Sequence, residues 1–345
     1  MVVNGFDREA EPGGAATEPP SGDAPQSGDR LGSRTAVPDP ADPERISGEM
    51  LYLAGRPTLR GFIRFVRGHA IPPPREDALV EEWQAARAHV LRLEVDEAGI
   101  ADHPPITSLP LPQYEPLLTE LLRDPLVRYN FNTVPTDIAQ VPLDRLVVYQ
   151  KHIDLGFVGR LREQLGPTPD EARIFRMCLP YDHPQPPVQW SAARQDSFVF
   201  VSPSNDLRFL GAMPLQAGNV TGLAPPGALV GVIGIAVGFG TNFLNAIHAE
   251  NRLILNNGSH RAYALYESGV THAPCIIQHV SSRDELEVVG PAAVKRTPDL
   301  YLRDPRPPML RDYFDPELRK ILPARRRLRQ VIVKFQVEET DVPAL

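Results

Sequence analysis

The chain has 345 residues, of which 42% are hydrophobic, with a formal net charge of −7 and two cysteines. This charge argues against a general polyanion binder, because nonspecific affinity for nucleic acid comes from neutralising phosphates with Lys and Arg. Only a local basic patch would be compatible with DNA binding. Cys178 and Cys275 lie far apart and show no CxxC spacing. We therefore expect two buried thiols in a reducing compartment, without a disulfide framework.

The first residues and the apolar runs bear on location. Met1 starts no basic-then-apolar signal segment, and the longest apolar run, 228–239, is too short and too rich in glycine to span a bilayer. We expect a soluble, cytoplasmic protein with no membrane partner. Residues 1–48 are rich in Pro, Gly, Ala, Asp and Ser and nearly lack large apolar side chains. Such a segment buries too little surface to offset the entropy of ordering, so we predict a disordered tail.

Residues 49–133 are predicted to form a helical amino-terminal region. Apolar residues recur at helical intervals in three segments, and prolines separate them. The predicted helices are 51–67, with a basic face, 76–96 and 116–127.

The pattern changes near residue 134, where strand-like segments begin to alternate with helical ones. Residues 140–149 have β-branched and aromatic content, and 155–165 return to a helical period that ends at Gly166. Residues 229–237 are apolar on both alternating faces, which is typical of a buried central strand. Further strands are predicted at 174–177, 188–190, 197–201, 251–256, 274–280 and 331–337, with helices at 259–267 and in part of 311–322.

The most informative segment is Asn257-Gly258-Ser259-His260-Arg261, which joins the strand at 251–256 to the helix at 259–267. Backbone N–H groups at a glycine turn, the positive end of a helix and two basic side chains together suit an anion such as phosphate. Positive charge in a first helical turn also opposes the helix dipole, which favours an anionic ligand.

Each of these residues also has a plain structural interpretation. Gly258 could serve only a left-handed turn, and Ser259 could be the N-cap of the helix. His260 and Arg261 could form ion pairs with nearby acids such as Glu250 or Glu267. The sequence leaves both interpretations open.

A second polar group follows the strand at 140–149. Asp154 could accept a substrate proton or hold magnesium, and His152 could act as a general base near neutral pH. The alternative is a solvated loop or a helix cap, because Asp is itself a preferred capping residue. Four histidines and a cysteine are candidate zinc ligands: His248, His260, His272, His279 and Cys275. Their spacing matches none of the usual zinc patterns, so no metal site is predicted.

Two segments resemble the ParB and sulfiredoxin superfamily. The run Val-Pro-Leu-Asp-Arg-Leu-Val-Val at 141–148 looks like the opening strand of those proteins, and 255–265 looks like their glycine-to-arginine box. The two blocks are separated by an insertion at about 178–245. The resemblance implies an α+β fold, with a ParB/sulfiredoxin-like core of short strands and flanking helices over residues 134–345.

The resemblance also implies a nucleotide or phosphate at the box. Sulfiredoxins carry a reactive cysteine where this chain has Ser259, which argues against sulfinic-acid reduction. ParB partition proteins follow the core with a helix-turn-helix, and no clear helix pair follows residue 280.

The function expected from the resemblance is therefore an NTPase or phosphotransferase that uses ATP or CTP with magnesium and acts on a small hydroxyl-bearing acceptor. Residues Asn257 to Arg261 would hold the nucleotide, and Asp154, His152 and His260 would act on the acceptor. The alternative is a non-catalytic ParB-like regulatory module that binds DNA or a protein.

Overall fold

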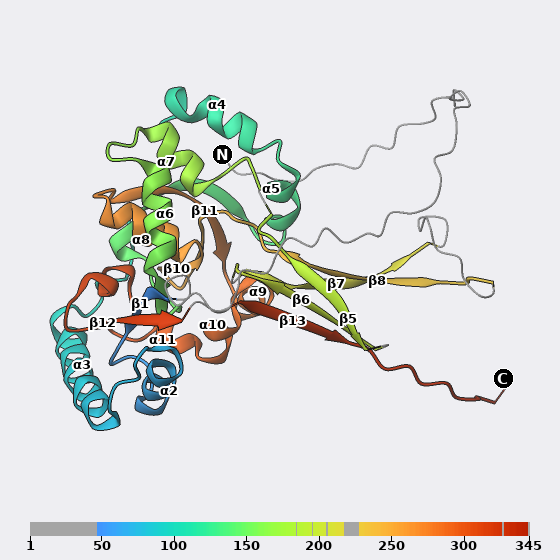
Figure 1. Ribbon diagram of the computed structural model, residues 1–345. Coiled ribbons are helices and arrows are strands. Elements are labelled where there is room, and N and C mark those ends of the chain that lie inside the picture. Colours follow the sequence, from blue (N-terminus) through green and yellow to red (C-terminus); the bar gives the residue numbers. More distant parts are fainter. Residues whose placement is uncertain are drawn as a thin grey trace.

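The computed structural model describes residues 47–183, 185–194, 196–204, 206–216, 228–325 and 328–343, and it shows a mixed α+β chain. The predicted tail lies outside these residues except for Ser47 and Gly48, which begin a strand. A body of helices and two sheets carries a group of long strands that projects from one side (Figure 1).

Several helices of the body begin at short polar caps. Asp124, Asp154 and Asp170 each accept a hydrogen bond from the backbone of the helix that follows, as N-cap residues do. The predicted helices at 76–96, 155–165 and 259–267 are confirmed. The helices are α2 (Leu59–His69), α3 (Glu76–Asp96), α4 (Leu111–Leu121), α5 (Pro125–Asn130), α6 (Leu155–Leu165), α7 (Glu171–Cys178), α8 (Ser259–Glu267), α9 (Arg283–Val289), α10 (Ala292–Arg296) and α11 (Pro298–Leu302), with 3₁₀ turns η1 (Leu143–Arg145) and η3 (Leu310–Phe314).

The larger sheet of the body has the strand order β10-β9-β11-β3-β2. Strands β9 and β11 are parallel and the other neighbours are antiparallel. Glu250 and Asn251 have positive φ angles, as a tight hairpin turn between β9 and β10 requires. The strands are β2 (Thr107–Ser108), β3 (Thr136–Pro142), β9 (Asn245–Ala249), β10 (Arg252–Asn257) and β11 (His272–Val280).

The smaller sheet joins distant parts of the chain. Its central strand β1 (Ser47–Leu53) pairs with β12 (Arg319–Arg325) on one side and with β4 (His152–Asp154) on the other. Strand β2 likewise adds to β3 in the larger sheet. The predicted amino-terminal region 49–133 therefore shares both sheets with the residues that follow it.

A buried ion pair fixes the connection that leads into η3. Arg306 and Asp312 are each 1% exposed and form a two-pronged pair, Nη1 to Oδ2 at 3.1 Å and Nη2 to Oδ1 at 2.5 Å. The Nε of Arg306 also donates to Glu97 at the end of α3, at 2.8 Å. A bidentate pair of this kind orients as well as attracts, so it sets the position of the chain before β12.

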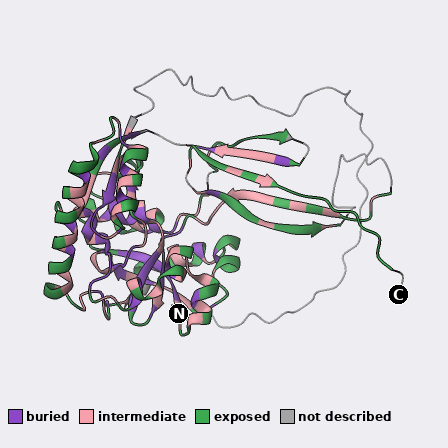
Figure 2. Cartoon of the chain, turned by 90° about the horizontal axis from the view of Figure 1, so that it is seen from below, coloured by how far each residue is buried: buried purple, intermediate pink, exposed green. Residues whose placement is uncertain are grey.

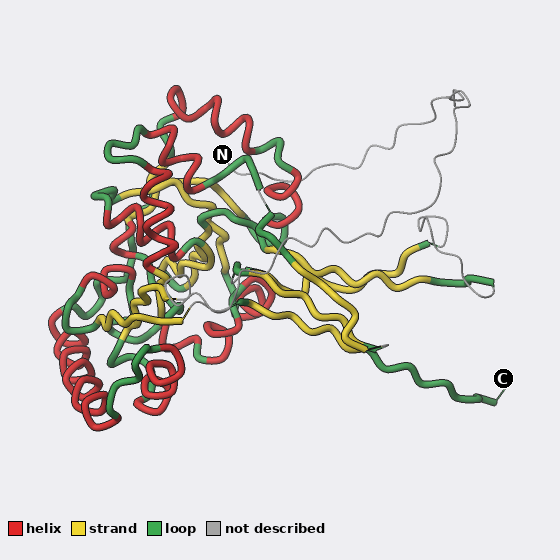
Figure 3. Tube along the Cα trace, viewed as in Figure 1, coloured by secondary structure: helices red, strands yellow, loops and turns green. Residues whose placement is uncertain are grey.

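The last part of the fold is a group of strands that we call the β-arm. It contains a sheet of order β13-β6-β5 and a hairpin of β7 and β8, and it projects away from the body in Figures 1 and 3. All but one of its strands come from the predicted insertion at about 178–245, and the last comes from the C-terminal part of the chain. The strands are β5 (Gln189–Arg194), β6 (Ser197–Ser202), β7 (Leu207–Leu215), β8 (Val232–Phe239) and β13 (Arg329–Lys334).

Several predictions about local structure are wrong. Of residues 140–149, which are predicted to form a strand, only 140–142 lie in β3, and 143–145 form the 3₁₀ turn η1. Residues 51–53 lie in strand β1 and not in a helix, because their apolar side chains are buried in the sheet. Residues 174–177 lie in helix α7 and not in a strand, with Asp170 as its cap. Strand β8 is not a buried central strand: Ile233 and Ile235 are exposed, and its one partner among the described residues is β7.

No helix among the described residues has both the length and the apolar character that a membrane crossing requires.

Candidate functional site

The predicted phosphate segment lies at the junction of β10 and α8. Gly258 has a φ of +94°, and a Cβ at this position would lie 2.7 Å from the side chain of Leu244. Only glycine adopts this positive φ readily and has no Cβ to collide with Leu244. The prediction that Ser259 caps α8 is wrong, because Gly258 is the N-cap and Ser259 is the first helical residue. The Oδ1 of Asn257 accepts a hydrogen bond from the N–H of Gly258 at 2.9 Å.

The first turn of α8 presents backbone donors. None of the described residues accepts a hydrogen bond from the N–H groups of Ser259, His260 or Arg261; the first bond of the helix runs from Ala262 to Gly258. Three such groups and the positive end of the helix dipole can hold an anion.

The side chain of Arg261 turns into the protein. The residue is 6% exposed, and its Nη1 donates to the carbonyl oxygen of Cys178 at 3.1 Å and of Met177 at 3.4 Å. The guanidinium also donates to both the carbonyl oxygen and the Oδ1 of Asn242. Burial lowers the pKa of this guanidinium to about 10. Arg261 therefore binds three backbone carbonyl oxygens and the side chain of Asn242 inside the protein.

These contacts join the two ends of the insertion. Residue 178 is the last of α7, where the chain leaves the body, and residues 242–244 are where it returns to β9. The N–H of Leu244 donates to the carbonyl oxygen of Cys178 at 2.7 Å. The Nδ2 of Asn257 donates to the carbonyl oxygen of Thr241 at 2.5 Å. The segment from Asn257 to Arg261 thus fastens the base of the β-arm to the body.

The three residues predicted to be catalytic, His152, Asp154 and His260, lie near one another where β4 meets the start of α8. The Nε2 of His260 accepts a hydrogen bond from the N–H of Asp154 at 3.0 Å, and His152 lies two residues earlier on β4. The carboxylate of Asp154 accepts from the N–H of Phe157 at 2.9 Å, as the N-cap of α6. The capping interpretation of Asp154 is therefore the one that the structure shows.

The environment keeps both histidines neutral. Burial, with a smaller contribution from the nearby His152, lowers the pKa of His260 to about 4, and Asp154 opposes the shift. Burial and His69 likewise lower the pKa of His152. A neutral His260 agrees with its geometry, because an Nε2 that accepts a hydrogen bond carries no proton.

The side chains of His260 and Arg261 therefore diverge from the start of α8. The expected ion pairs with Glu250 or Glu267 do not occur. Glu267 pairs with Arg162 at 3.2 Å, and Glu250 pairs with arginines of the segment after β11. Positive charge in the first turn of α8 would oppose the helix dipole. His260 avoids this because it is neutral, and backbone carbonyl oxygens compensate the charge of Arg261.

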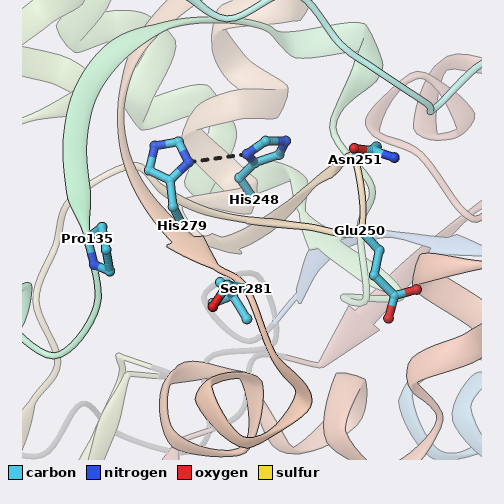
Figure 4. A pocket seen from close by; sticks show the side chains of 7 residues that line it. Pro135, His248, Glu250, Asn251, His279 and Ser281 are labelled. Carbon is cyan, nitrogen blue, oxygen red and sulfur yellow. Dashed lines mark hydrogen bonds between the residues drawn. The ribbon is translucent and has the colours of Figure 1, made fainter.

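A separate cavity of roughly 270 Å³ lies at the end of the larger sheet (Figure 4). Two histidines of neighbouring strands, His248 and His279, line it, with their Nδ1 atoms 3.2 Å apart. Asp137 on β3 lies 3.3 Å from the Nε2 of His279. Asp137 cannot be identified from the sequence, because only the pairing of three strands brings these residues together.

The remaining candidates for metal binding stay apart. Among the described residues, no group of three or more His, Cys, Asp or Glu has the geometry to hold a metal ion. Cys178 and Cys275 are buried free thiols, as predicted, and burial raises the pKa of Cys178 to about 12. Such thiols are poor nucleophiles.

No family model, curated protein or solved structure matches this chain.

Proposed function

We propose that this chain is a non-catalytic binding module that engages a partner protein through the β-arm. The observation that carries the proposal is that each of the two sheets of the β-arm bears exposed large apolar side chains. Exposed apolar side chains that lie together are a feature of interaction sites in soluble proteins. The exposed large apolar residues on its strands are Trp190, Phe209, Leu210, Met213, Ile233, Ile235 and Ile332.

The burial pattern supports the same conclusion. Figure 2 shows the body with a buried interior, whereas the strands of the β-arm are mostly intermediate or exposed along their length. A three-stranded sheet and a hairpin with so little buried surface gain less from folding than a covered sheet does. A partner that covers the β-arm would supply the missing burial.

The outer strand β5 offers a specific mode of contact. Among the described residues, the strand that pairs with it is β6, and residues 190–193 are all exposed. Trp190 is 67% exposed and its ring lies 6.1 Å from that of Phe200. An open edge accepts an added strand through backbone hydrogen bonds, and a tryptophan beside it provides an anchor. The partner we infer is an extended protein segment with apolar residues at alternate positions.

The candidate catalytic groups support a binding role over a catalytic one. Asp154 caps a helix, His260 accepts a backbone hydrogen bond and Arg261 is bonded to carbonyl oxygens. Each polar side chain is thereby engaged in structure.

The test is selection of extended ten-residue peptides from a display library, followed by calorimetry with the peptides that are enriched. We expect Trp190→Ser to weaken their binding at least tenfold. Phe157→Ser is the matched control, because Phe157 is a 40% exposed aromatic residue outside the β-arm. Peptide binding that Trp190→Ser leaves unchanged would refute the proposal. So would a stable dimer of the free chain that Trp190→Ser dissociates, which would assign the surface to a second copy.

A second candidate function is supported by the open backbone donors of α8. In it, ATP or CTP with magnesium binds by its phosphates to the N–H groups of Ser259, His260 and Arg261, beside the left-handed turn at Gly258. Phosphoryl transfer to a hydroxyl-bearing acceptor would then involve Asp154, His152 and His260. Titration of ATP, CTP and GTP with magnesium tests it, and absence of binding to the wild-type chain would eliminate it.

A further inference from the structure

Three polar residues form a row across neighbouring strands of the larger sheet. Asp137 lies on β3, His279 on β11 and His248 on β9, and His279 is directly opposite His248 in the parallel pairing. Figure 4 shows the two imidazole rings turned toward each other above the cavity. The row is separate from the segment at α8 and takes no part in the proposed function.

A carboxylate lies behind the first of the two rings. The Nε2 of His279 is 3.3 Å from Oδ2 of Asp137, and the Nδ1 on the opposite side of the ring faces His248. With its proton on Nε2, His279 has a free lone pair on Nδ1. A carboxylate behind a histidine is the usual arrangement around a protein-bound metal, because it fixes the tautomer and raises the basicity of the ligand nitrogen.

The spacing of the two rings has a direct geometric meaning. Two imidazole nitrogens bound to one tetrahedral zinc, each about 2.0–2.1 Å from the ion, lie roughly 3.3 Å from each other. The Nδ1 atoms of His248 and His279 are joined by a hydrogen bond of 3.2 Å, and a metal ion would replace the proton of that bond. Both rings can therefore donate to a single ion without a change in the backbone.

The charge of the surroundings suits a cation. The Oδ1 of Asp137 is buried and has no hydrogen-bond partner among the described residues, so its negative charge is only partly compensated. Glu250, which also lines the cavity, is already paired with Arg283 at 2.7 Å and Arg303 at 3.2 Å.

We propose that His248 and His279 bind one transition-metal dication through their Nδ1 atoms, with Asp137 as the supporting carboxylate. Imidazole ligands favour zinc, nickel, cobalt or copper, whereas magnesium and calcium require oxygen ligands. Because no third His, Cys, Asp or Glu among the described residues completes the site, the other positions of the ion face the cavity and take water or an external ligand. Structural zinc sites are closed by four protein ligands, so this open site would belong to the ligand-binding class.

The experiment is calorimetric titration of the full chain with zinc, and with magnesium as the comparison ion. We expect one zinc per chain, no comparable magnesium binding, and loss of zinc binding in both His248→Asn and His279→Asn. Asp137→Asn is expected to weaken zinc binding by about 10–100-fold. His272→Asn is the matched control, because His272 lies at the exposed start of the same strand as His279.

The thermal unfolding of each metal-free variant shows whether it is folded. If a histidine variant fails to fold, the Asp137→Asn and His272→Asn variants decide the question by their relative affinities. Zinc binding that is equal in the wild type and in Asp137→Asn, or that His272→Asn weakens as strongly, would overturn the proposal. No zinc binding to the wild-type chain would overturn it as well.

Discussion

Replacing Arg261 with methionine tests whether this residue fastens the β-arm or serves a ligand. Methionine has a similar length but cannot donate the four hydrogen bonds that the guanidinium makes to Met177, Cys178 and Asn242. Hydrogen bonds from a charged donor contribute about 1.5 kcal/mol each at the lower end of their range, or about 6 kcal/mol together.

Burial of the charge offsets part of this gain. The pKa of Arg261 falls from 12.5 to about 10, which corresponds to a net destabilisation of the charged form by roughly 3 kcal/mol. We therefore expect the Arg261→Met variant to lose about 3 kcal/mol in its free energy of unfolding. The loss should appear locally as well, as faster amide exchange at Leu244, whose N–H donates to Cys178.

Urea unfolding at pH 7 measures the global loss. The control is Arg162→Met, which removes a half-exposed pair with Glu267 and is expected to change the unfolding free energy by less than about 1 kcal/mol. The reasoning would be refuted if Arg261→Met were as stable as this control. Loss of nucleotide affinity at full stability would instead assign Arg261 to a ligand.

Three further predictions concern stability. Gly258→Ala is expected to lower the free energy of unfolding by about 3 kcal/mol, because the backbone is left-handed and the new Cβ would lie 2.7 Å from Leu244. Gly269→Ala is the control: its φ is +84° but its Cβ would meet open space, so the loss should be about 1 kcal/mol. Equal losses in urea unfolding would contradict this. The pKa of His260 is about 4 in the folded chain against 6.5 in the unfolded chain, so the unfolded chain takes up the proton first as the pH falls. The folded state should lose about 2 kcal/mol between pH 7 and 5, and an unchanged pH profile in His260→Gln would rule this group out. Arg306→Met is expected to lower the free energy of unfolding by about 3–5 kcal/mol, because it leaves the carboxylate of Asp312 buried without its partner. Adding Asp312→Leu to this variant should restore part of the loss, as measured by thermal unfolding. Absence of any recovery would contradict the role of the pair.

The sequence predicts part of the local structure of the body. Helices α3, α6 and α8 have regular apolar spacing and clear boundaries such as Gly166, whose φ is +76°. The failure at 229–237 has a physical cause. Apolar alternation in 229–237 predicts a buried strand, but burial depends on what covers the sheet, and the strand lies in the β-arm.

The candidate site was predictable in its backbone and not in its side chains. The left-handed glycine and the helix that follows it are local properties, and the sequence identifies them. The partner of Arg261 is not local, because the loop that contains Asn242 reaches it only after the whole insertion has folded back. In the same way, Asp137 and His279 become neighbours only through strand pairing.

The meeting of Cys178 and Leu244 has a consequence for how this chain could vary. A hydrogen bond of 2.7 Å joins the residues that bound the insertion, and it belongs to the body on both sides. The loop-closure entropy of a segment held at its two ends grows only slowly with its length. Residues could therefore be gained or lost in the hairpin of β7 and β8 while the body keeps its hydrogen bonds. The surface that the chain presents to other molecules is in this sense free to change independently of the fold that carries it.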